Sequence, residues 1–340
     1  MPTCGTQCYL CDYPVRFDTY AGCSHGCTYC FARRVRRKAL ENVRRREGAR
    51  ALESFIQGGR SLKTNWASWR IPIHFGGVSD PFQPEEKRHR RTYRCLQLLA
   101  ESQYPFIIST KGELAASPTY LEVLERCNCV FQLSAVCARY DAMEPGAPRF
   151  MERVRMMRRI APRVKRLIVR VQPYMREVFH DVYGNLARFR DAGAYGVIFE
   201  GRKFFSERRG LIRLGGYYCY PYELVRRDFL RLRKRAHTLG LRMFAGENRI
   251  RALGDSLSCC GTEGLDGFVP NVFNLSHILN GDPVTSTPAQ RAVGTADCFS
   301  ALGQTTWNSL RLKGTSFAAE MLDYYDCNRI AVERMLGLRW

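Results

Sequence analysis

The 340-residue sequence predicts an α/β protein, a full or partial (β/α) barrel with N-terminal and C-terminal extensions. Short β-type apolar segments alternate with longer helical ones along most of the chain, which favours parallel strands joined by right-handed crossovers. The chain is also long enough for one large barrel, and its 45% hydrophobic content is ample for a core.

The elements follow from local patterns, taken in chain order. Residues 15–20 read as the first strand, and helically spaced apolar residues predict one arginine-rich helix over 31–57, ended by Gly58 and Gly59. Further strands are expected at 71–75, 106–109, 130–136, 167–171, 196–199 and 241–244. Further helices are expected at 87–101, 117–126, 148–160, 223–239 and 316–336. Ser117 and Pro118 suit the N-cap and first position of their helix.

Three parts are expected: an N-terminal cysteine motif at 1–14, the barrel at 15–250, and a C-terminal extension at 251–340 that closes or covers the barrel. No window approaches eighteen uninterrupted apolar residues, and the N-terminus lacks a charged stretch followed by an apolar one. The sequence therefore predicts a soluble, cytoplasmic protein with no membrane partner.

Three cysteines in a glycine-bearing loop, Cys23, Cys27 and Cys30, are spaced CxxxCxxC. Three thiolates can hold three corners of a 4Fe-4S cluster and leave its fourth iron open for chemistry. The alternatives are a zinc site or cysteines that are merely buried. Zinc fits less well, because it usually takes four ligands, often from two CxxC pairs.

The same spacing occurs earlier, at Cys4, Cys8 and Cys11, without a long helix after it. In a long chain of fifteen cysteines with no signal segment, metal ligation explains the clustered ones better than disulfides do. The first triplet is therefore a candidate for a second iron-sulfur cluster or a zinc ion. Its completing ligands are expected at the adjacent Cys259 and Cys260, with Cys298 next.

The order of strand, cysteine loop and helix, with Tyr29 before Cys30, resembles the radical S-adenosylmethionine (radical SAM) superfamily. The stretch Ser79-Asp80-Pro-Phe-Gln-Pro is similar to the spore photoproduct lyase-like family, and the likeness covers roughly residues 16–200. It implies a barrel of the radical SAM type whose cluster chelates SAM at the free iron. An electron from a donor such as flavodoxin or ferredoxin then cleaves SAM to a 5'-deoxyadenosyl radical, which abstracts hydrogen from the substrate.

The resemblance also implies a SAM site. Gly76 and Gly77 match the glycines that contact the SAM amino group, and Ser134 and Arg170 match polar residues that hold its ribose and carboxylate. Independently, active sites of such barrels lie at the C-terminal ends of strands. That rule selects Ser109, Lys111, Ser134, Arg170, Gln172 and Glu200. Arg170 lies on an apolar strand, so it requires an anionic partner or a route to solvent, and a carboxylate of the protein would serve equally.

The resemblance does not extend to the reaction. In photoproduct lyase a hydrogen-donating cysteine lies two residues before the Ser-Asp pair, and here that place is Gly77. Repair of the thymine photoproduct would need another thiol, such as Cys95 or Cys137. The sequence assigns no catalytic residue.

The net charge of +21 favours a polyanionic partner, and arginine, which grips phosphates bidentately, favours nucleic acid. The stretch 202–222 combines several basic residues with four tyrosines, as in surfaces that stack bases while cations hold phosphates. The alternative is that the arginines only form a solvated surface and bind no polyanion.

The first hypothesis for the function is a radical SAM enzyme that modifies or repairs nucleic acid. The others are a peptide-modifying radical SAM enzyme with an auxiliary cluster, and a non-catalytic, metal-containing nucleic-acid-binding protein.

Overall fold

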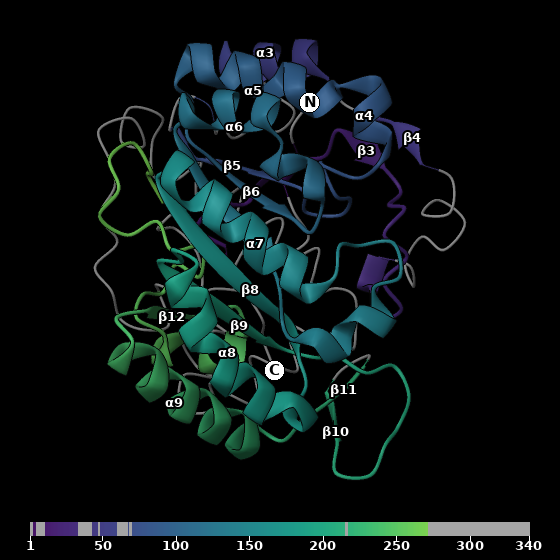
Figure 1. Ribbon diagram of the computed structural model, residues 1–340, viewed down its shortest axis with the longest axis vertical. Helices are drawn as coiled ribbons and strands as arrows, with labels where there is room; N and C mark the ends of the chain where they lie inside the picture. Colours follow the sequence, from purple (N-terminus) through teal and green to yellow (C-terminus); the bar gives the residue numbers. More distant parts are fainter. Residues whose placement is uncertain are drawn as a thin grey trace, which may run out of the picture.

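A curved eight-stranded sheet forms the centre of the computed structural model, which describes residues 3–4, 11–32, 43–46, 48–59, 67, 70–214 and 217–270 (Figure 1). Its strand order is β1-β2-β5-β6-β7-β8-β9-β12. Every pair from β2 to β12 is parallel, and β1 (Thr3–Cys4) adds an antiparallel edge. The prediction of a partial α/β barrel is confirmed.

The parallel strands fall close to the expected segments. They are β2 (Val15–Phe17), β5 (Ile73–Phe75), β6 (Phe106–Thr110), β7 (Cys129–Ser134), β8 (Arg166–Tyr174), β9 (Gly196–Gly201) and β12 (Arg242–Ala245). Two short antiparallel pairs lie outside this sheet. They are β3 (Tyr20–Ala21) with β4 (Arg44–Arg45), and β10 (Ile212–Leu214) with β11 (Tyr217–Cys219).

Helices cover the convex face of the sheet (Figure 1). They are α3 (Ala49–Ile56), α4 (Glu85–His89), α5 (Arg91–Ser102), α6 (Pro118–Glu125), α7 (Phe150–Ile160), α8 (Phe179–Asp191) and α9 (Tyr222–Thr238). Short 3-10 turns include η2 (Glu113–Ala116), η3 (Ala138–Met143), η4 (Ala161–Arg163), η5 (Arg176–Val178) and η6 (Asn248–Leu253). Within the described ranges, no helix has both the length and the apolar character needed to cross a bilayer.

The single helix expected over 31–57 is wrong. Arg44 and Arg45 form β4, which pairs with β3, and the Arg46 N–H donates to Thr19 O at 3.0 Å. Helix α3 begins only at Ala49, after Gly48, where a Cβ would lie 2.9 Å from the Arg91 side chain. The backbone of this segment therefore finds strand partners in the tertiary structure, although its apolar spacing is helical.

Two further differences concern helices. The segment 87–101 is divided at Arg90, whose φ of +47° ends α4 and starts α5. Helix α8 was not expected at all. The predicted helix at 316–336 and Cys298 lie outside the described residues.

Side chains alternate between the two faces of the sheet, as the two-residue period of a strand requires. On the convex side, residues such as Phe106, Phe131 and Val169 pack in the main core beneath the helices. The concave side is apolar in the first half of the strands, where Ile107 and Ile168 lie in a second core. Further along, the same face turns polar, with Ser109, Gln132, Arg170 and Glu200 at successive inward positions. The C-terminal end of the sheet is called the mouth below, and the N-terminal end the base.

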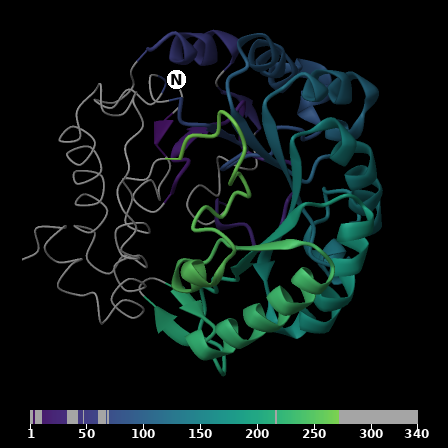
Figure 2. The ribbon, with the colours of Figure 1, turned by 90° about the vertical axis from the view of Figure 1, so that its left-hand side faces the viewer.

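The segment 254–268 closes the base from inside. Figure 2 shows the chain up to residue 270 running through the middle of the curved sheet. Phe268 and Cys260 pack with Tyr13 against the concave apolar residues. At the start of β8, Arg166 donates to the carbonyl oxygens of Gly261 and Glu263 at 2.9 and 2.7 Å.

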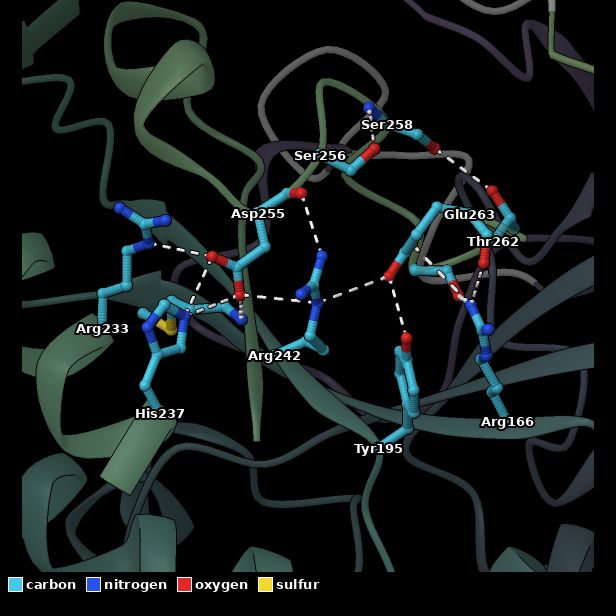
Figure 3. A network of polar contacts seen from close by, with 12 residues as sticks. Arg166, Tyr195, Arg233, His237, Arg242, Asp255, Ser256, Ser258, Thr262 and Glu263 are labelled. Atoms are coloured by element: carbon cyan, nitrogen blue, oxygen red, sulfur yellow. Dashed lines mark hydrogen bonds and ion pairs between the residues drawn. The ribbon is translucent and has the colours of Figure 1, made fainter. Parts of the chain in front are cut away.

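Asp255 anchors this segment to α9 and β12 (Figure 3). Its carboxylate accepts from Arg233 Nε at 2.9 Å, His237 Nε2 at 2.8 Å and the Met243 N–H at 2.7 Å, and the side chain is 2% exposed. Burial alone would raise the pKa of Asp255, but the Met243 N–H and the two cationic partners hold it below its ordinary value of 3.8.

Asp255→Asn is expected to lower the free energy of unfolding by about 2 kcal/mol at pH 7, since the partner cations are partly exposed. A carboxyl whose folded pKa is depressed contributes stability above its unfolded pKa and loses it as the pH falls through the folded value. The difference in free energy of unfolding between the wild type and Asp255→Asn should therefore shrink below about pH 4. Urea unfolding from pH 7 to 3 measures both effects. The exposed Asp266→Asn is the matched control, and an equal loss in both variants would contradict the anchoring role.

Candidate active site at the barrel mouth

Cys23, Cys27 and Cys30 lie in the loop after β3, at the mouth, where the charge of each would act on the next. Cys27 is buried and the other two are half-buried, and all three are free thiols. Burial raises the pKa of Cys23 to about 12, and Asp80 and Cys27 reinforce the shift. Burial likewise raises the pKa of Cys27, against Lys111, with Glu144 and Cys30 adding to the rise. Without a bound cation the Cys23 and Cys27 thiols are held in the neutral form.

Asp80 and His25 fix this cysteine loop through a buried ion pair. His25 Nε2 lies 3.1 Å from Asp80 Oδ2, and its Nδ1 lies 2.8 Å from Gly146 O. Because both ring nitrogens face oxygen acceptors, the ring is the doubly protonated imidazolium. Burial alone would raise the pKa of Asp80, but His25 lowers it to about 2, helped by Thr110 and the Lys111 N–H.

The rest of the Ser-Asp-Pro-Phe-Gln stretch holds the same loop by hydrogen bonds. Gln83 is fully buried; its Oε1 accepts from the Ser24 N–H at 3.0 Å and its Nε2 donates to Gly22 O at 3.2 Å. Ser79 Oγ donates to Tyr20 O at 2.6 Å. These residues thus hold the loop that carries the three cysteines.

A second buried network supports the loop from the side of α7. The Tyr29 hydroxyl and the Arg153 guanidinium both donate to the Glu144 carboxylate, and Arg153, 1% exposed, also donates to Ser134 O at 2.8 Å. Lys111 Nζ lies 4.0 Å from Glu144 Oε1. The sequence reasoning missed Glu144 and Arg153, since one arginine among several in α7 gives no local sign that it is the buried one.

Arg170 is the centre of a polar cluster on the concave face. Its Nη1 donates to Gln132 Oε1 at 2.6 Å and to Ser109 Oγ at 3.3 Å, and its Nε donates to Gln172 Oε1 at 3.0 Å. His74 Nε2 lies 2.9 Å from Ser109 Oγ. These hydrogen-bond partners are neutral rather than carboxylates, and Arg170 is half-buried, so it keeps the route to solvent that was the other expectation. The arrangement leaves a positive charge at the mouth that suits an anionic group.

Glu200, on β9, lies near this cluster. Burial raises the pKa of its carboxyl to about 7, although Lys203 and Arg170 oppose the rise. It borders a pocket at the ends of β9 and β12, lined also by Lys203, Tyr217, Glu247 and Arg249. Sequence reasoning selected Glu200 from its strand end but gave no sign of the pocket.

The other predicted SAM contacts have partners within the chain. At Gly76, where φ is +76°, a Cβ would lie 2.4 Å from Ser109 O, and at Gly77 it would lie 2.9 Å from Arg16 Cδ. Both glycines thus have a packing reason to lack a side chain. Ser134 is half-buried on β7, in register with Arg170. Their roles toward SAM remain predictions.

The structure also brings Cys11 to Cys259 and Cys260 inside the base. The Cys259 and Cys260 sulfurs are 4.0 Å apart, and Cys11 is electrostatically coupled to Cys259. The side chains of Cys4 and Cys8 lie outside the described residues. Among described residues, no three His, Cys, Asp or Glu side chains converge on a single ion.

Asp80→Asn is expected to lower the free energy of unfolding of the metal-free protein by about 3 kcal/mol, because His25 loses its buried counter-charge. Less iron should also be retained after anaerobic reconstitution. Glu85→Gln is the matched control, since Glu85 accepts from Ser24 Oγ of the same loop at 3.0 Å but at the surface. Urea unfolding and iron analysis measure both variants. Indistinguishable results for the two would contradict the positioning role of Asp80.

Comparisons with known proteins bear on the fold. No family model and no curated protein matches the sequence. A mutant of spore photoproduct lyase with bound AdoMet and dinucleoside spore photoproduct aligns with a TM-score of 0.54 and 15% identity, over 68% of this chain and 76% of that one. SuiB of Streptococcus suis bound to S-adenosylmethionine aligns with a TM-score of 0.50 and 13% identity, over 69% and 51% of the two chains. The chain therefore has the fold of these radical SAM enzymes, a partial α/β barrel.

Proposed function

We propose that the chain is a radical SAM enzyme with a 4Fe-4S cluster on Cys23, Cys27 and Cys30, and that its substrate is a nucleic acid modified or repaired at a base or sugar. The carrying observation is that three cysteines lie in one loop at the mouth, which the His25–Asp80 ion pair holds in place. The fold shared with SAM-bound structures supports it. When bound, such a cluster would supply the one electron that cleaves a carbon–sulfur bond of SAM, giving methionine and a 5'-deoxyadenosyl radical that takes hydrogen from the substrate.

The residues of the chain would bind the cluster and SAM and orient them. Lys111, close to Cys27, offsets part of the negative charge of three thiolates. Arg170, whose hydrogen-bond partners are neutral, would pair with the SAM carboxylate, and Ser134 beside it would hold the ribose. Gly76 and Gly77 would present backbone groups to the SAM amino group. The electron donor would be a small redox protein such as flavodoxin or ferredoxin.

Cys27→Ala is expected to abolish reductive cleavage of SAM by the anaerobically reconstituted protein, because a cluster ligand is lost. Release of 5'-deoxyadenosine is the measurement, with dithionite as the reductant. Cys127→Ala is the matched control: Cys127 is a buried thiol that donates to Val123 O at 3.1 Å on the convex side. Cleavage of SAM that persists in Cys27→Ala would contradict the assignment of Cys27 as a cluster ligand. Its absence from the wild type would favour a non-catalytic, metal-containing nucleic-acid-binding protein.

A basic arm beside the mouth supports a nucleic-acid substrate. We use this name for residues 202–213, which lead from β9 through β10 to the β10–β11 hairpin and loop away from the body of the protein (Figure 1). Arg208, Arg209 and Arg213 are exposed on it, and Phe205 is 40% exposed. Cations that hold phosphates beside aromatic rings that stack on bases are typical of single-stranded nucleic-acid surfaces.

The arm also connects to the pocket. Lys203 lines the pocket and lies 4.6 Å from the Tyr217 ring centroid, and Arg202 lines it too. The Arg208 guanidinium lies 5.0 Å from the centroid of Phe204. A strand held by the arm would thus lie next to the pocket at the ends of β9 and β12.

Replacing Arg208, Arg209 and Arg213 by alanine is expected to weaken binding of single-stranded oligonucleotides. It should also reduce the slope of log affinity against log salt by roughly 2, because each lost phosphate contact removes about 0.7 from the slope for single strands. Alanine at Arg155, Arg158 and Arg159, exposed on α7, removes equal charge elsewhere and is the matched control. Equal losses in both variants would show a general charge effect. If the substrate is a peptide, its binding should depend only weakly on salt in both variants.

A further inference from the structure

The base of the barrel holds a second group of thiols, which the proposed reaction does not use. Cys11 comes from the N-terminal segment, and Cys259 and Cys260 come from the segment that closes the base. Cys11 and Cys259 are close enough for their charges to interact, and the sulfurs of Cys259 and Cys260 are 4.0 Å apart. Chain folding, not local spacing, brings the three together.

A buried cation lies among these thiols. Arg251 is 5% exposed, and its strongest electrostatic neighbours are Cys259, Cys11, Asp12 and Cys260. A buried guanidinium requires negative charge nearby. Thiolates on a metal carry negative charge that Arg251 can offset, beside the carboxylate of Asp12.

Apolar side chains surround one side of the group, and Arg170, Arg251 and Asp12 are its charged neighbours. Cys260 is packed in the concave apolar core with residues including Tyr13, Ile168, Phe244 and Phe268, and Cys11 and Cys259 pack against it. Such a shell keeps solvent and competing ligands from a metal and holds the ligands in place. Soft thiolates in an apolar shell select zinc or iron-sulfur clusters over magnesium or calcium.

We propose that Cys11, Cys259 and Cys260 bind a second metal centre, a zinc ion or an iron-sulfur cluster, in the base of the barrel. Two thiolates on one tetrahedral metal with bonds of about 2.3 Å lie about 3.8 Å apart, close to the separation of Cys259 and Cys260. The described side chains do not converge three at a time on one ion. A zinc ion would draw Cys11 inward, whereas a cluster would bind the thiolates on separate irons. This centre does not depend on the cluster at the mouth.

The test begins with the full chain carrying Cys23→Ala, Cys27→Ala and Cys30→Ala, which removes the site at the mouth. After anaerobic purification we expect metal to remain, either zinc without sulfide or iron with sulfide. Adding Cys259→Ser and Cys260→Ser should reduce that metal to the level of the buffer. Adding Cys127→Ser and Cys129→Ser instead, two buried thiols of the convex core, should leave it unchanged. Absence of metal from the first variant, or equal loss in the last two, would overturn the proposal.

X-ray absorption at the zinc or iron edge on the first variant tests the proposal without altering the base, should Cys259→Ser prevent folding. We expect a first shell dominated by sulfur at about 2.3 Å. A shell of nitrogen and oxygen would show an adventitious metal and would overturn the proposal. The SAM-cleavage assay of Cys27→Ala reports on the other site, so the two proposals can fail separately.

Discussion

The buried ion pair between His25 and Asp80 is the interaction on which the candidate site depends. It connects the cysteine loop with the loop after β5, and the same two side chains reach the Lys111 N–H after β6 and Gly146 O beyond η3. Four connections at one end of a parallel sheet are thereby held together. In a low-dielectric interior such a pair is strong only if its remaining hydrogen-bonding groups are satisfied, and the Asp80 carboxylate also accepts from Thr110 Oγ1 and the Lys111 N–H.

Fixing the loop in this way has a chemical purpose. A cluster whose protein ligands all come from one loop can be held in place only as firmly as that loop. Gln83, Ser79 and the Glu144–Arg153 pair reinforce the loop from two sides, so the thiols are arranged before any metal binds. The residues that carry the family resemblance at Ser79 and Asp80 therefore act through position.

The concave face of the sheet separates two environments along the same strands. Inward-facing residues near the base are apolar, and those near the mouth are polar. On each strand, inward-facing residues are two positions apart. The parallel register places the corresponding residues of neighbouring strands side by side, so each kind forms a continuous layer. Arg170 places a positive charge where the strands end, and Tyr13, Cys260 and Phe268 fill the other half. One sheet thus carries a positive charge toward its mouth and an apolar core toward its base, where the second group of thiols lies.

The sequence by itself determined the parallel strands, most helices, the cysteine triplet and the strand ends that bear Ser109, Arg170 and Glu200. These depend on spacings of two to four residues, which are visible locally. Only the tertiary structure decided that Arg44 pairs in a strand, that the hydrogen-bond partners of Arg170 are neutral, and that Cys11 meets Cys259. Strand register and the segments that fill the barrel determine which partner a buried charge or thiol meets. The residues adjacent to it in the sequence indicate neither.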